Sequence, residues 1–214
     1  MLPQSQPDRE ARLYRWTISA IALFVLALAS VEVVAALRVD SRFLLRDGLE
    51  WGYDVLIFGI AALSFNRGPR IERLAGFALA FILLMAGLQT AFQIWLTLVR
   101  PPEIEIEAVT ISAALIVVEG WLVVLALRRF RHSHNPVIEA TWLSSRNDAI
   151  TGSLYALLTL AARLAPMTWP QLGVDALTVF LCLRAAKQVW LDARAIERLP
   201  PDALGDTPDA EPTV

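Results

Sequence analysis

Long apolar runs separated by short polar stretches fill most of the chain. A bilayer core about 30 Å thick needs roughly 20 mostly apolar residues for each spanning helix. Six runs approach this length, and we predict a membrane-spanning helix over each of them. They are Tyr14 to Leu37, Leu49 to Phe65, Leu74 to Val99, Ala108 to Leu127, Leu143 to Leu164 and Leu172 to Val189. The pattern therefore predicts an all-α, polytopic membrane protein with six transmembrane helices.

The same pattern divides the chain into three parts. Residues 1–13 are a polar N-terminal segment, which we expect to be loose until about Arg12, and residues 14–195 are the six-helix transmembrane domain. Residues 196–214 are rich in proline and acid with little to bury, so they predict a disordered tail with no soluble domain after the membrane part. The first apolar run is too long for a signal peptide, so we expect it to be retained as a helix.

Composition and charge placement agree with a membrane protein. Of the 214 residues, 56% are hydrophobic and 19% are charged, which is far from the balance of a soluble domain. Most of the 19 basic residues fall in the N-terminal segment, in the second-to-third and fourth-to-fifth connections, or at the C-terminal end. By the positive-inside rule we predict a multi-pass protein of the cell (inner) membrane with both termini in the cytoplasm. We expect no nucleic-acid partner.

Several acids interrupt the predicted spans or lie at their ends. An ionised side chain there costs about 3 kcal/mol on insertion scales, so such residues normally face a bundle interior or a watery cavity. They are Glu32, Glu50, Asp54, Glu119, Asp148 and Asp175.

Two pairs of polar residues have a spacing that suits a cation site. Glu50 and Asp54 are one helical turn apart, as are Ser144 and Asp148. Two such pairs on two helices could supply four oxygen ligands to one ion. Oxygen ligands suit manganese, magnesium or iron, and zinc also accepts carboxylates. Asp47 lies on the same stripe as Glu50 and Asp54.

Other interpretations of these polar residues stay open. Asp47 and Asp148 lie near predicted helix N-termini, where an acid can cap free N-H groups. Glu119 could form an accessory ion or proton site, or a structural hydrogen bond to a neighbouring helix. Gln89 and Gln93 share a face of the third helix, where hydrogen bonding to another helix is the favoured interpretation.

Enzyme chemistry has little support in the sequence. The single cysteine, Cys182, lies within a span and predicts a small core residue rather than a zinc ligand or half of a disulfide. His132 and His134 lie in a basic loop and are expected to be solvated. No serine nucleophile with a base and no phosphate-binding loop is visible, so we predict that the protein is not an enzyme.

Several spaced motifs together resemble the cation diffusion facilitator, or cation efflux, family over roughly residues 14 to 195. "SRFLLRDGLEWGYD" is similar to the second-helix pattern of that family, and "NRGPRIERLAGF" to its arginine-x-glutamate-x-leucine-alanine run. "LVRPPEIEI" resembles its proline-bearing turn, and "LGVDAL" resembles the opening of its sixth helix at Asp175. The positions that carry the first two motifs are Ser41, Asp47, Glu50 and Asp54, then Arg70, Glu72, Leu74 and Ala75.

The resemblance implies export of divalent metal from the cytoplasm in exchange for protons, usually by a homodimer. The metal ligands that it implies are Glu50, Asp54, Ser144 and Asp148. Asp47, Glu119 and Asp175 are possible accessory residues, and we expect the substrate to be zinc, manganese, iron or cobalt. Zinc-selective members usually have histidine at one or both of the places held here by Glu50 and Ser144. The cytoplasmic domain that commonly follows the sixth helix is not expected.

The mechanism that we expect is alternating access around the second and fifth helices. Metal and protons would compete for the same carboxylate oxygens, which couples their movements in opposite directions. The alternative is a metal-binding membrane protein that no longer transports and acts as a regulator or partner, which the weak neutral ligand Ser144 favours.

Overall fold

The computed structural model of the protein describes residues 5–40, 42–99, 106–131, 135–162 and 169–197. These residues form six α-helices and one short 3-10 turn, and the described parts contain no strand. The bounds are α1 Ser5–Val39, α2 Arg42–Ser64, α3 Pro69–Val99, α4 Ile106–Leu127, η1 Arg128–Phe130, α5 Pro136–Ala162 and α6 Trp169–Glu197. The all-α prediction and the helix count are therefore confirmed.

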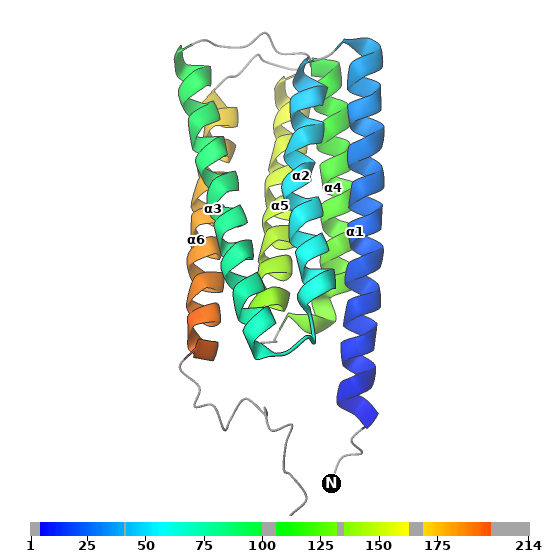
Figure 1. The fold of residues 1–214 in the computed structure, drawn as a ribbon. Coiled ribbons are helices and arrows are strands. Elements are labelled where there is room, and N and C mark those ends of the chain that lie inside the picture. The colour runs from blue at the N-terminus through cyan, green and yellow to red at the C-terminus, as the bar shows by residue number, and fades with distance from the viewer. Residues whose placement is uncertain (1–4, 41, 100–105, 132–134, 163–168, 198–214) are drawn as a thin grey trace, which may run out of the picture.

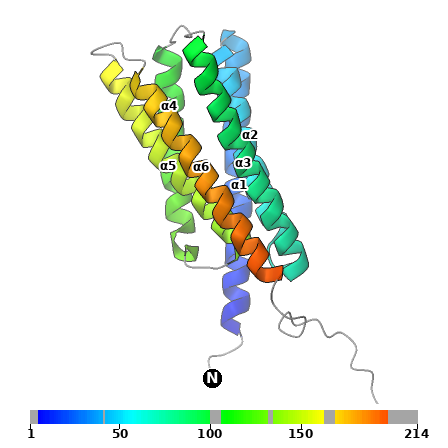
Figure 2. The same ribbon diagram turned by 90° about the vertical axis from the view of Figure 1, so that its left-hand side faces the viewer.

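Three antiparallel helix pairs make up the bundle. α1 packs along α2, α4 along α5, and α3 along α6, while α5 also packs against α6 (Figure 1). The view turned by 90° shows α6 crossing in front of α5 and α4 (Figure 2). α2 makes a much smaller contact with α3 than it makes with α1. The start of α1 and the end of α6 lie at the same end of the bundle.

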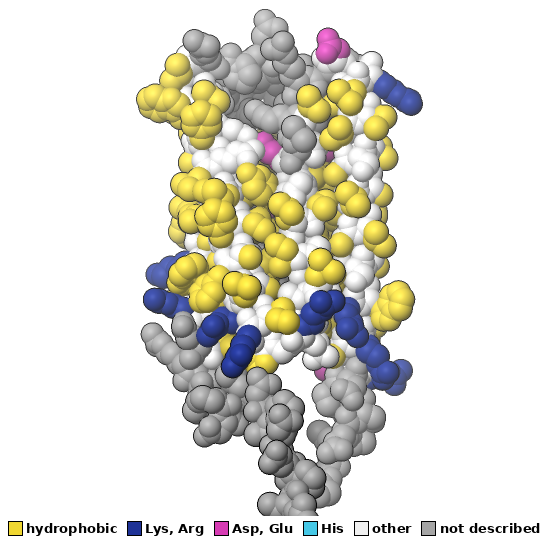
Figure 3. All heavy atoms as spheres, in the orientation of Figure 1, with side chains coloured by type: hydrophobic (Ala, Val, Ile, Leu, Met, Phe, Trp, Pro, Cys, Tyr) yellow, Lys and Arg dark blue, Asp and Glu magenta, His cyan; other side chains and the backbone are white. Residues whose placement is uncertain are grey.

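The surface of the bundle suits lipid around its middle and water at one end. Large apolar side chains such as Leu23, Phe81, Phe92 and Leu160 point outward, and arginine and lysine side chains gather near the end where α1 begins (Figure 3). By length and apolar composition, two helical segments of the described residues are able to cross a membrane, Arg9–Arg38 and Pro69–Val99. Six crossings stay a prediction.

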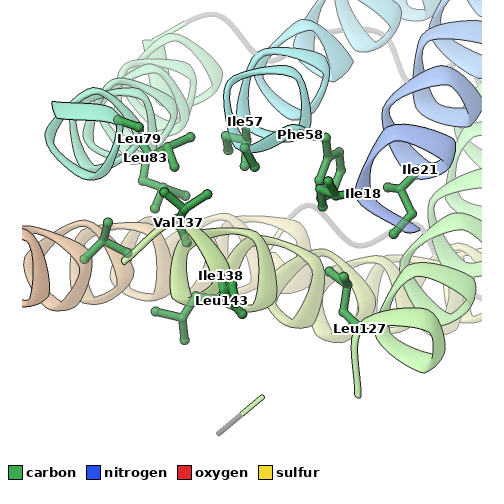
Figure 4. Close-up of a cluster of buried hydrophobic side chains, with 14 of the residues drawn as sticks. Ile18, Ile21, Ile57, Phe58, Leu79, Leu83, Leu127, Val137, Ile138 and Leu143 are labelled. Carbon is green, nitrogen blue, oxygen red and sulfur yellow. The ribbon is translucent and has the colours of Figure 1, made fainter. Parts of the chain in front are cut away.

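A buried apolar cluster links the helices of the bundle. Ile57 and Phe58 of α2 belong to it together with side chains from α1, α3, α4 and α5 (Figure 4). Tyr14 of α1 closes this region, because its hydroxyl hydrogen bonds to the Thr141 hydroxyl at 2.9 Å and its ring lies 4.4 Å from that of Phe65. Packing here joins all the helices that carry the candidate ligands.

All six helices begin earlier than the apolar runs indicate, and the differences are largest for α1, α2 and α5. α1 starts at Ser5, so the expectation of a loose segment up to about Arg12 is wrong. α5 starts at Pro136, seven residues before the predicted span. Asn135 caps α5, since its side-chain Oδ1 accepts a hydrogen bond from the Val137 amide at 2.9 Å, and Pro136 suits the first turn. A search for apolar runs misses the first turns of these helices because they contain polar residues.

Candidate metal centre

α2 and α5 bring two carboxylates together around one hydroxyl. The Ser144 Oγ lies 3.2 Å from Oδ1 of Asp54 and 3.5 Å from Oδ2 of Asp148, and Ser144 is only 5% exposed. A hydroxyl carries one hydrogen, so it can donate to one of these carboxylates at a time. The arrangement places Asp54, Ser144 and Asp148 of the predicted ligand set in contact.

Asp148 is not a helix cap. Because α5 begins at Pro136, Asp148 lies three turns inside the helix, where no free N-H group remains to be capped. Asp47 lies in the second turn of α2, which begins at Arg42, and its side chain is outside the part of the structure that is described.

Glu50 turns toward α3. Its Oε1 accepts a hydrogen bond of 2.5 Å from Nε2 of Gln93. On the same side of α2, the Tyr53 hydroxyl donates to Oε1 of Gln89. The prediction that the two glutamines bond to another helix is therefore confirmed, and one of their partners is a predicted metal ligand.

Glu119 of α4 lies near the pair of aspartates. It is 5% exposed, and its carboxyl is close enough to Asp54 and Asp148 for their charges to interact. The close approach of α4 and α5 explains this position, since a Cβ added to Gly120 would lie 2.8 Å from the backbone of Ala149. Glu119 and Asp148 are the chain neighbours of these two residues. An accessory role at the site stays a prediction.

Asp175 and the two histidines of the chain are the remaining candidate residues. Asp175 is buried in α6 at 9% exposure, whereas His132 and His134 lie outside the described residues. In this conformation, no three described His, Cys, Asp or Glu side chains converge closely enough to hold a metal ion. Glu50, Asp54 and Asp148 therefore do not meet at one point.

Sequence reasoning missed Asn147, which lies beside Asp148 in the chain. Asn147 is 3% exposed, and neither its side-chain oxygen nor its side-chain nitrogen has a hydrogen-bond partner among the described residues. The run "SSRND" was the available signal, because five consecutive polar residues are unusual inside a buried helix. Asp148 is charged and was a candidate from the sequence, whereas a neutral amide such as Asn147 is a weaker signal.

Comparison with known proteins places the bundle in a family. A family model described as the cation efflux transmembrane domain matches residues 18–185, which include every candidate metal ligand. No curated protein gives a significant match to the chain. Members of the matched family are transporters rather than enzymes. The chain therefore belongs to the cation efflux family of membrane transporters.

Proposed function

We propose that this protein exports divalent metal cations from the cytoplasm in exchange for protons, using Glu50, Asp54, Ser144 and Asp148 as its ion site. The observation that carries the proposal is the contact of Asp54 and Asp148 with one buried serine between α2 and α5. Membership of the cation efflux family supplies the direction of transport.

The donor atoms favour a hard or borderline divalent ion. Three carboxylates and one hydroxyl offer oxygen only, which suits manganese, iron(II) or cobalt, and zinc also accepts carboxylates. A doubly charged ion offsets the repulsion between Asp54 and Asp148, which is otherwise costly in an apolar bundle. The charge of the site therefore selects for a divalent cation as substrate.

Exchange with protons follows from competition for the same oxygens. A carboxylate binds either a metal ion or a proton at a given lone pair, so metal entry releases protons. Protons arriving from the opposite side would then displace the metal. Opening the site alternately to each side, with α2 moving relative to α5, completes the proposed cycle in the cell membrane. The working unit is proposed to be a homodimer.

The first experiment is metal-stimulated proton flux in proteoliposomes. The intact chain, Asp54→Ala and Asp40→Asn are compared with zinc, manganese, iron(II) and cobalt. Asp40 is an exposed acid with φ of 53°, a conformation that asparagine tolerates, so this variant removes a carboxylate without touching the site. We expect flux with at least one metal, its loss in Asp54→Ala, and flux within about twofold of the intact chain in Asp40→Asn. Flux that survives in Asp54→Ala would contradict the proposed site.

A regulator that binds metal without moving it is the second candidate. Ser144 favours it, because a neutral hydroxyl is a weaker ligand than a carboxylate or an imidazole. Calorimetry of the same preparation separates the two functions. Metal binding that depends on Asp54, with no proton flux for any of the four metals, would move the conclusion to the regulator.

A further inference from the structure

The boundary between α2 and α3 is held in part by two side-chain hydrogen bonds. Tyr53 donates to Gln89, and Gln93 donates to Glu50. Gln89 and Gln93 are one turn apart on α3, so both bonds belong to one polar strip along a limited helix contact. Three of the four side chains are neutral, and the fourth is a ligand in the proposed ion site.

In its present position, the Glu50 carboxylate cannot both accept the hydrogen bond from Gln93 and ligate an ion held by Asp54 and Asp148. Glu50 bonds to α3, while Asp54 and Asp148 meet at Ser144 of α5. These three acids do not converge on one point among the described residues. Closing four ligands around an ion therefore requires the Glu50 carboxylate to leave the Gln93 amide.

We propose that Gln93 is a positioning residue that competes with the cation for Glu50. It holds the Glu50 carboxylate against α3 through the hydrogen bond that it donates and releases it when a cation binds. This inference rests on the proposed function. Hydrogen bonds between membrane helices are weak on average, so moving the Glu50 carboxylate from Gln93 to the ion costs little free energy in a transport cycle.

The exchange also links ion occupancy to the packing of α3. α3 packs mainly along α6, whereas α2 packs mainly along α1. When Glu50 turns to the ion, α2 loses the hydrogen bond that Glu50 accepts from Gln93 of α3. Loading of the site would then free α2 to move relative to the α3 and α6 pair.

The test is a double-mutant cycle on the full chain in proteoliposomes, using the metal that gives the largest flux with the intact protein. The variants are Gln93→Met, Glu50→Gln and the combination of both. Methionine keeps the length and helix preference of glutamine and removes its donor. Gln89→Met is the matched control, because it removes the hydrogen bond from Tyr53 of α2 to Gln89 of α3 without touching Glu50. Melting temperatures show whether each variant is folded, and Gln93→Leu replaces Gln93→Met if that variant does not fold.

We expect Gln93→Met to lower the half-saturating metal concentration by about three- to tenfold, the range set by the loss of one competing interhelical hydrogen bond. The maximal flux should fall, because the ion is released more slowly. Glu50→Gln removes a ligand carboxylate and is expected to lower flux, so metal affinity in this background is measured by calorimetry, and Gln93→Met should leave it unchanged there. Gln89→Met should leave the half-saturating concentration within about twofold of the intact value. Damage to the fold alone weakens binding, so a gain in affinity distinguishes positioning from a structural role.

Three results overturn the inference while leaving the proposed function intact. They are an unchanged or raised half-saturating concentration in Gln93→Met, the same effect in the Glu50→Gln background, and an equal effect of Gln89→Met. Absence of metal-stimulated flux in the intact chain overturns the proposed function and this inference together.

Discussion

Ser144 shows how one neutral side chain can organise two charged ones. Its hydroxyl lies between the carboxylates of Asp54 and Asp148, and it can lend its single hydrogen to either of them. In the proposed ion site, the same oxygen would face the metal as a ligand. A serine at this place would therefore orient the two carboxylates and add modest affinity for the ion.

We predict that Ser144→Ala weakens metal binding and preserves transport. Loss of one neutral ligand should raise the half-saturating metal concentration by about three- to tenfold, the effect of losing roughly 1 kcal/mol. Ser145→Ala is the matched control, because Ser145 is equally buried but donates to the Thr141 carbonyl at 2.7 Å. Titration of flux against metal concentration measures both variants. Complete loss of flux in Ser144→Ala, or an equal shift in Ser145→Ala, would contradict this role.

The part of the candidate site that could be predicted from the sequence is the spacing of polar residues along a single helix. Spacings of four residues identified Glu50 with Asp54 and Ser144 with Asp148 before any fold was known. The partners of these residues across helices were not predictable. Nothing in the sequence near Glu50 indicates Gln93, which lies 43 positions away, and Glu119 reaches the aspartates only through the packing of α4 on α5.

At the scale of helices, close approach depends on small residues. Gly120 lies against the backbone of Ala149, and a Cβ at Gly152 would lie 2.5 Å from Cγ2 of Ile116. α4 and α5 thus meet with little side chain between them, as small residues allow between membrane helices. This contact sets the distance between Glu119 and Asp148.

We predict that Gly120→Ala separates α4 from α5 near the site. The new methyl group would overlap the Ala149 backbone, which cannot rotate away as a side chain can. Overpacking of this kind costs about 1–3 kcal/mol of stability. Gly59→Ala is the control, because nothing lies within 4 Å of a Cβ at Gly59. Thermal unfolding in detergent compares the two variants. Equal melting temperatures would show that the bundle adjusts without cost.

Helix ends follow local rules that a search for apolar runs does not use. Asn135 and Pro136 are a cap and a first-turn residue, and they start α5 within a polar stretch. Glu72 of α3 accepts hydrogen bonds from the Asn66 amide at 2.7 Å and from Nδ2 of Asn135 at 2.6 Å. The connections before α3 and before α5 are thus joined by one carboxylate, which is a role for the glutamate of the arginine-x-glutamate motif that spacing alone does not reveal.

We predict that Glu72→Ala destabilises the bundle without removing the ion site. Two hydrogen bonds to one carboxylate would be lost, which costs about 1–3 kcal/mol for a charged acceptor. The melting temperature should fall, while the half-saturating metal concentration should stay within about twofold of the intact value. A large change in metal affinity with an unchanged melting temperature would place Glu72 in the transport path instead.

On the scale of the whole molecule, the proposed exchange of metal for protons predicts a pH dependence whose direction follows from the proposed carboxylate ligands. Carboxylates must lose their protons to bind metal, so acidification on the metal-loading side should raise the half-saturating metal concentration. The increase is at most about tenfold per pH unit for each proton displaced. Flux assays at several internal and external pH values provide the measurement. A half-saturating concentration that does not depend on pH would exclude competition between protons and metal.

The arrangement of charge over the molecule predicts its orientation. Both described ends, the start of α1 and the end of α6, lie where arginine and lysine side chains gather. Arg67 lies in the connection between α2 and α3 at this end, whereas Arg38 lies in the last turn of α1 at the other. Both arginines are exposed, which makes them a matched pair for labelling.

The labelling experiment uses Cys182→Ala as background, since Cys182 is the single cysteine of the chain. Arg38→Cys and Arg67→Cys are each treated with a membrane-impermeant maleimide, first on intact cells and then on opened membranes. If the basic end faces the cytoplasm, as the positive-inside rule requires, position 38 is labelled in intact cells and position 67 only after opening. The opposite pattern would show that the basic end faces outward. The proposed site would then load metal from outside, and the protein would import metal rather than export it. Labelling of both positions in intact cells would contradict a single crossing of the membrane by α2, which lies between them. α2 is the helix of interest because it carries the polar residues of the proposed site.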